Sequence, residues 1–121
     1  MHLARVLYRQ GKLTSAEATL SLAVTKSEKV YPARSEMLIA AQVVWGDLCS
    51  DTARHAAAEE HYRKAVEADE ANDNLPGIIF DLQRLSDCLI RQDRLQEAEQ
   101  VILQAIGAET RHAQQFAAEK T

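Results

Sequence analysis

Residues 45–65, WGDLCSDTARHAAAEEHYRKA, decide the fold of this chain, because their pattern recurs once before them and once after them. They read as the end of one helix, a short break and the start of a second helix. The second half places Ala58, Tyr62 and Ala65 at positions i, i+4 and i+7, which form one stripe of an α-helix. Gly46 follows the single tryptophan, and a small residue at this place lets a neighbouring helix approach closely.

The pattern appears in three copies, at spacings of 42 and 40 residues. Six columns of matching residues keep this register. The columns are Leu3/Trp45/Leu85, Ala4/Gly46/Ser86, Leu7/Cys49/Leu89, Ala16/Ala58/Ala98, Leu20/Tyr62/Ile102 and Ala23/Ala65/Ala105. Because no copy can bury its apolar stripe alone, the sequence predicts that the copies stack on one another.

The composition supports helices throughout. Only four glycines and two prolines occur, and residues that favour helix dominate the 121 positions. We expect breaks at Tyr31-Pro32 and at Leu75-Pro76-Gly77, and we expect Asp69, Glu70 and Asp73 to be solvated loop residues. The chain is therefore predicted to be all-α, with helices at 2–10, 14–30, 34–50, 54–71, 77–91 and 95–117.

The columns resemble the tetratricopeptide repeat, whose helix pairs carry the small and large residues seen here at Gly46, Ala58 and Tyr62. The period of 40–42 residues is longer than that of the common form, and Glu70 and Thr110 stand where the family has a closing proline. The resemblance implies a right-handed α-solenoid of three helix–turn–helix repeats. We expect one domain over 1–121, a fragment of a longer array, with repeats at about 1–33, 34–75 and 76–121.

The charge and the candidate reactive residues disfavour several classes of function. The net charge is −4, which argues against nucleic-acid binding, although residues 1–34 carry +4, residues 35–74 carry −6 and residues 75–121 carry −2. Cys49 and Cys88 fit core positions better than a nucleophile, and no zinc-type spacing occurs. We predict no enzyme, no metal and no cofactor. Because no membrane span or signal peptide is evident, we expect no membrane partner and a cytoplasmic location.

The resemblance also implies a binding surface, because the first helices of such repeats line a concave groove. It assigns the partner-binding groove to Arg5, Tyr8, Arg9, Val43, Asp47, Asp51, Phe80, Gln83, Arg84, Asp87 and Arg91. Arginines beside tyrosine and phenylalanine suit an acidic peptide or helix, whereas the plain alternative is an ordinary solvated surface. A clamp for chaperone C-termini is disfavoured, because the matching positions offer only Arg5 and Arg84 as donors.

The expected function is therefore that of a protein–protein interaction module, a scaffold or adaptor that binds a partner protein or peptide. Two alternatives remain. The chain could be a homo-oligomerisation module, such as a homodimer, that uses Leu3 and Leu7 at one end and Phe116 at the other. It could also be the sensory or regulatory segment of a larger signalling protein.

Overall fold

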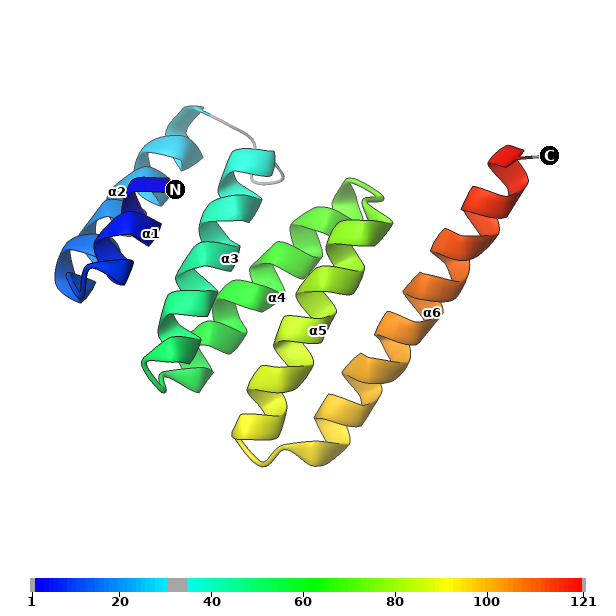
Figure 1. Cartoon of the computed structure of the whole chain (residues 1–121). Helices are drawn as coiled ribbons and strands as arrows, with labels where there is room; N and C mark the ends of the chain where they lie inside the picture. The colour runs from blue at the N-terminus through cyan, green and yellow to red at the C-terminus, as the bar shows by residue number, and fades with distance from the viewer. Residues whose placement is uncertain (1, 31–34, 121) are drawn as a thin grey trace.

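The computed structural model describes residues 2–30 and 35–120, and all of its regular structure is helical. The described residues form six helices, and Figure 1 shows the pair α1–α2 at one end of the molecule and α6 at the other. Each helix packs against the next one along the chain. The helices are α1 (His2–Arg9), α2 (Leu13–Val30), α3 (Glu36–Asp51), α4 (His55–Ala71), α5 (Leu75–Arg91) and α6 (Leu95–Lys120). The prediction of an all-α helical-repeat solenoid is confirmed.

The turn inside each helix pair has the same form in all three copies. Gly11, Ala53 and Asp93 take positive φ angles of 76°, 63° and 61°. In each turn the next amide donates back to the carbonyl five residues earlier, as from Arg54 N to Cys49 O at 2.8 Å. This pattern satisfies the last carbonyl groups of a helix and reverses the chain within a few residues. The repeated turn makes the two helices of each pair antiparallel.

Close packing inside a pair depends on the small column. A Cβ atom built on Gly46 would lie 2.5 Å from Cε1 of Tyr62, so a larger residue in α3 would displace the Tyr62 ring of α4. Ala4 and Ser86, the equivalents of Gly46, are also buried. The six columns therefore lie mostly in the core, as their small and apolar residues predict. The exceptions are at the two ends, where Leu3 and Ile102 remain exposed.

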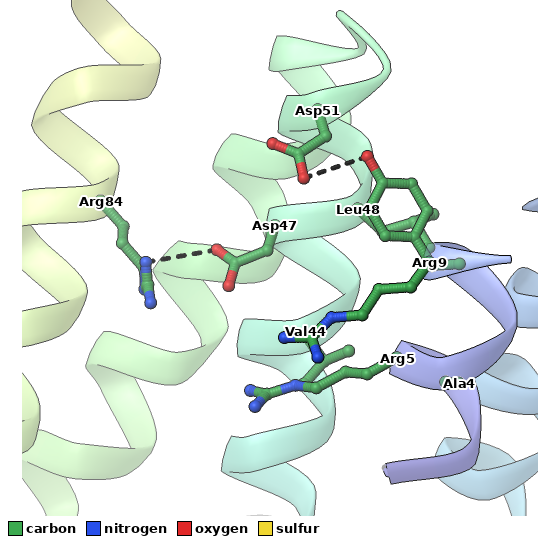
Figure 2. Close-up of a pocket in the computed structure, with 9 residues that line it drawn as sticks. Ala4, Arg5, Arg9, Val44, Asp47, Leu48, Asp51 and Arg84 are labelled. Carbon is green, nitrogen blue, oxygen red and sulfur yellow. Dashed lines mark hydrogen bonds and ion pairs between the residues drawn. The ribbon is translucent and has the colours of Figure 1, made fainter. Parts of the chain in front are cut away.

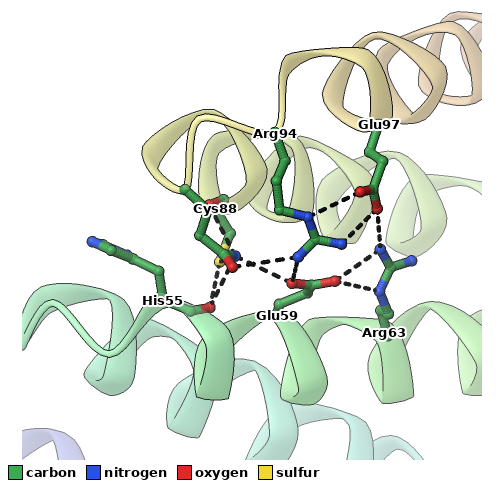
Figure 3. Close-up of polar contacts among 7 residues, drawn as sticks. His55, Glu59, Arg63, Cys88, Arg94 and Glu97 are labelled. Atoms are coloured by element: carbon green, nitrogen blue, oxygen red, sulfur yellow. Dashed lines mark hydrogen bonds and ion pairs between the residues drawn. The ribbon is translucent and has the colours of Figure 1, made fainter.

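A cluster of charged side chains fastens the start of α6 to α4 (Figure 3). Arg94 bridges Glu59 of α4 and Glu97 of α6, and Arg63 Nη2 contacts Glu59 Oε2 at 2.9 Å. Burial alone would raise the pKa of Glu59, but hydrogen bonds from Arg63, Gln92 and Arg94 outweigh it and lower that pKa. Glu59 is therefore ionised and holds the third repeat against the second.

Two of the predicted helix ends are wrong by two or three residues, and four others differ from the observed ends by one residue. Helix α5 begins at Leu75 rather than at 77, because Pro76 occupies the first turn, where its missing N–H costs nothing. The Asn74 side chain caps this helix by accepting from Gly77 N at 3.4 Å. Helix α6 continues through Gly107 to Lys120, beyond the predicted end at 117. The predicted break at Tyr31-Pro32 and the predicted start of a helix at residue 34 lie outside the described residues.

The acidic residue Asp69 is also misplaced by the prediction. It lies within α4 rather than in a solvated loop, and only 3% of it is exposed. Its position against α5 makes it part of the candidate site described next.

Candidate functional site

Helices α1, α3 and α5 lie side by side on one face of the molecule and together line three adjoining cavities, here called the groove. The first cavity, of about 310 Å³, lies between α1 and α3 and reaches Arg84 of α5. The second, of about 290 Å³, lies between α3 and α5 and shares Asp47, Asp51 and Arg84 with the first. The third, of about 470 Å³, shares Arg5 with the first. The shared residues make the groove continuous.

The two aspartates of the first cavity are already engaged by neighbouring side chains. Asp47 accepts a hydrogen bond from the Tyr62 hydroxyl at 2.6 Å and pairs with Arg84 Nη1 at 3.4 Å. Asp51 accepts from the Tyr8 hydroxyl at 3.1 Å. Burial raises the pKa of Tyr62, and the hydrogen bond and charge of Asp47 raise it further. Both tyrosines are therefore neutral donors that hold the aspartates in place.

The arginines of the groove divide into one that is engaged and three that are available. Arg84 pairs with Asp47 and lies over the Phe80 ring, with its guanidinium carbon 3.9 Å from the ring centroid. Among the described residues, no ion pair involves Arg5, Arg9 or Arg91. Figure 2 shows Arg5 and Arg9 extending from α1 across the side of α3 that carries Asp47. These cations have free donor capacity at the surface of the groove.

The third cavity has a different character, because it combines apolar walls with a buried pair of acids. Asp69 of α4 accepts from Asn74 Nδ2 at 3.1 Å, and a Cβ atom on Gly77 would lie 2.6 Å from Asp69 Oδ2. Asp81 of α5 is 1% exposed. Burial raises the pKa of Asp81 to about 8, and the hydrogen bond and charge of Asp69 contribute in the same direction, against Arg84. Burial and the neighbouring Asp69 therefore favour the protonated form of Asp81, which can donate to Asp69.

Ten of the eleven residues predicted for the groove line these three cavities, and Gln83 is exposed on α5 without lining any of them. Val43 is only 8% exposed, so it forms part of the third cavity's wall rather than an open contact surface. The assignment of these residues to partner binding stays a prediction.

Sequence reasoning did not select Glu36, Asp69 and Asp81, which also line the third cavity. One signal was available for Asp81. It stands 40 residues after Ala41, the spacing of the repeat, and Ala41 is a buried residue of α3. An acid that shares a column with a buried alanine is an unusual feature that a column-by-column reading could have found.

The two cysteines, which are the candidate reactive thiols, lie in the core. Cys49 and Cys88 are free and buried, and burial raises the pKa of both thiols. Cys88 Sγ donates to the His55 carbonyl at 2.8 Å. Within residues 2–30 and 35–120, no three His, Cys, Asp or Glu side chains gather in a way that could hold a metal ion. No described helix is both long and apolar enough to cross a bilayer.

Comparison with known proteins finds one matching family. The model of a family described as tetratricopeptide repeat matches residues 1–71 of the chain. This region contains the first two copies of the pattern, and the third copy continues the same columns beyond it. No curated protein matches the chain.

Proposed function

Because the chain belongs to the tetratricopeptide repeat family, whose repeats generally mediate protein–protein interaction, we propose that it binds a segment of a partner protein in its groove. The observation that carries this proposal is the groove along α1, α3 and α5, lined by three arginines, Arg5, Arg9 and Arg91, that form no ion pair with another described residue. The role is that of a scaffold or adaptor without catalysis. The free, buried thiols of Cys49 and Cys88 fit a reducing compartment such as the cytoplasm.

The charges of the groove indicate the chemistry of the partner. Arg5 and Arg9 line the first cavity and Arg91 lines the second, while Asp47 and Asp51, which the two cavities share, are engaged by Tyr8, Tyr62 and Arg84. Asp87 also lines the second cavity, next to Arg91. Guanidinium groups bind carboxylates through two parallel hydrogen bonds, which adds geometric specificity to charge attraction. The partner segment is therefore acidic where it crosses the first two cavities, and it is an extended peptide or a helix.

A capture experiment tests this proposal. The chain and a triple variant, Arg5→Glu, Arg9→Glu and Arg91→Glu, are immobilised and exposed to a lysate of the cells that express the protein, and the bound proteins are quantified by mass spectrometry. We expect the native chain to enrich an acidic partner and the variant to lose it by about tenfold or more, since each reversed charge pair costs on the order of 1 kcal/mol.

A matched control changes the same net charge outside the groove. Lys26, Lys29 and Arg111 are exposed on α2 and α6 and line none of the three cavities. Their replacement by glutamate should leave the partner bound. If the control variant loses the partner as completely as the groove variant does, binding follows net charge and the groove assignment is wrong.

A second candidate function, self-association, is favoured by a separate observation. Ile102, Leu103 and Ile106 form an exposed apolar patch on α6, and Leu3 is exposed on α1 at the other end. Residues 1–34 carry a net charge of +4 and the rest of the chain is acidic, so opposite ends of two copies attract each other. Sedimentation over a range of concentrations tests this candidate with a variant carrying Ile102→Lys and Ile106→Lys. A monomer at all concentrations for the native chain rejects it.

A further inference from the structure

The third cavity differs from the rest of the groove in both shape and charge. Its lining is mainly apolar and includes Ile39 and Val43 of α3 and Phe80 of α5. Two buried acids, Asp69 of α4 and Asp81 of α5, also line it. A cavity with a mainly apolar lining and two buried acids matches a long side chain that has a methylene stem and a charged head.

The buried acids are not fully satisfied by the protein. Asn74 donates to Asp69, but the Asp81 Oδ2 atom is buried and has no hydrogen-bond partner among the described residues. An orphaned buried carboxyl oxygen is costly and needs either a proton or a cation. In the free protein a proton on Asp81, donated to Asp69, fills this role.

We propose that the third cavity is a subsite for a lysine side chain of the bound partner, whose ammonium group replaces the shared proton between Asp69 and Asp81. This inference rests on the proposed function, because it places one residue of the same partner segment. The stem packs between Ile39 and Phe80, and the ammonium group donates to Asp81 Oδ2 and to Asp69. The displaced proton leaves to the solvent, so that one cation replaces another.

Lysine fits this site better than arginine does. An ammonium group is a compact charge with three donors that can point to oxygens on two different carboxylates. A guanidinium group prefers to pair with both oxygens of one carboxylate, and Asp69 Oδ1 already accepts from Asn74.

Other charged groups around the cavity set its pH dependence. Glu36 on α3 adds negative charge at the rim, while Arg5 on α1 and Arg84 on α5 oppose it. Because Asp81 must lose its proton when the ammonium group binds, affinity should rise with pH until the carboxyl is ionised in the free protein. The pKa of Asp81, raised to about 8 chiefly by burial, sets the upper end of that range.

The test uses a small probe rather than the unidentified partner. N-acetyl-lysine N-methylamide is titrated into the isotope-labelled chain, and the backbone amide signals of Gly77, Phe80 and Asp81 are followed by NMR. N-acetyl-norleucine N-methylamide, which has the same stem without the nitrogen, is the matched ligand control. We expect saturable shifts with the lysine probe alone, and an affinity that rises by up to about tenfold per pH unit between about pH 6 and about pH 8.

Two variants complete the test. Asp81→Asn keeps the shape and the hydrogen bond to Asp69 but removes the titrating carboxyl, so binding should weaken at least about tenfold and lose its pH dependence. Glu70→Gln removes an exposed acid next to Asp69 that does not line the cavity, and it should bind as the native chain does. Equal shifts with norleucine, or undiminished binding by Asp81→Asn, would overturn the inference. Neither result would bear on the proposed contacts of Arg5, Arg9 and Arg91 with the partner, because the capture experiment tests those contacts separately.

Discussion

The most specific prediction concerns stability, because the pair of buried acids links folding to pH. Asp81 has an ordinary pKa of 3.8 when unfolded and a pKa of about 8 in the folded chain, where burial disfavours its ionised form. The folded state therefore binds more protons than the unfolded state between these values. It follows that stability falls as pH rises through this window and is level on either side of it. Replacing Asp81 by asparagine removes this dependence.

The structure gives the size of the effect. Between the two pKa values one proton is taken up on folding, so each pH unit costs about 1.4 kcal/mol. From about pH 5 to about pH 8 the free energy of unfolding should fall by about 4 kcal/mol relative to that of Asp81→Asn, a large part of the 5–15 kcal/mol typical of a domain. The asparagine amide can still donate to Asp69, so the variant keeps the contact between α4 and α5.

Urea unfolding followed by far-ultraviolet circular dichroism at several pH values measures this difference. Other groups titrate in the same range: burial lowers the pKa of His61, for example, so its protonation destabilises the fold as pH falls below the ordinary value. Subtracting the two proteins cancels such contributions. Glu70→Gln serves as a control that replaces a carboxyl group by an amide at an exposed site. If the difference between Asp81→Asn and the native chain does not grow with pH, the shared-proton reasoning is wrong.

Three further predictions concern the repeat itself. Gly46→Ala should destabilise the chain by about 1–3 kcal/mol, because its Cβ would press on the Tyr62 ring, and an unchanged urea midpoint would contradict this. Ala53→Gly should stabilise it by up to about 1 kcal/mol, since Ala53 has a φ of 63° that glycine adopts without strain; a lower melting temperature would count against the turn argument. Cys49 and Cys88 should react with a thiol reagent only after unfolding, and rapid labelling of the native chain would show that they are accessible.

The repeat was predictable from sequence because it depends on local patterns that recur. Small residues at Gly46 and Ala58 and a large residue at Tyr62 define the contact of a helix pair, and the same residues recur at fixed spacing. The helix ends were less certain, because a Leu-Pro-Gly sequence is typical both of a turn and of a first helical turn. The Asn74 cap decides in favour of the helix.

Whether a residue is buried depends on the element that packs over it. The equivalent positions of the repeat alone do not predict which element that is. Ile102 shares a column with Leu20 and Tyr62, which are 0% and 3% exposed, yet it is 40% exposed. Helices α3 and α5 pack against α2 and α4, whereas no further described helix packs against the corresponding face of α6. The difference arises from the neighbouring element, so the column alone could not predict it.

The acids of the third cavity, Asp69 and Asp81, also depend on the elements around them, and in their case the dependence indicates a function. The second repeat has Ala41 at the position that corresponds to Asp81. Ala41 is buried, and its side chain has no polar group that needs a hydrogen-bond partner. An acid in its place costs stability at neutral pH, because burial disfavours its ionised form. A residue that lowers the stability of the fold is expected at a position that serves a function. The cavity beside it, with apolar walls and an orphaned carboxyl oxygen, gives that task a specific chemistry: recognition of a positively charged side chain.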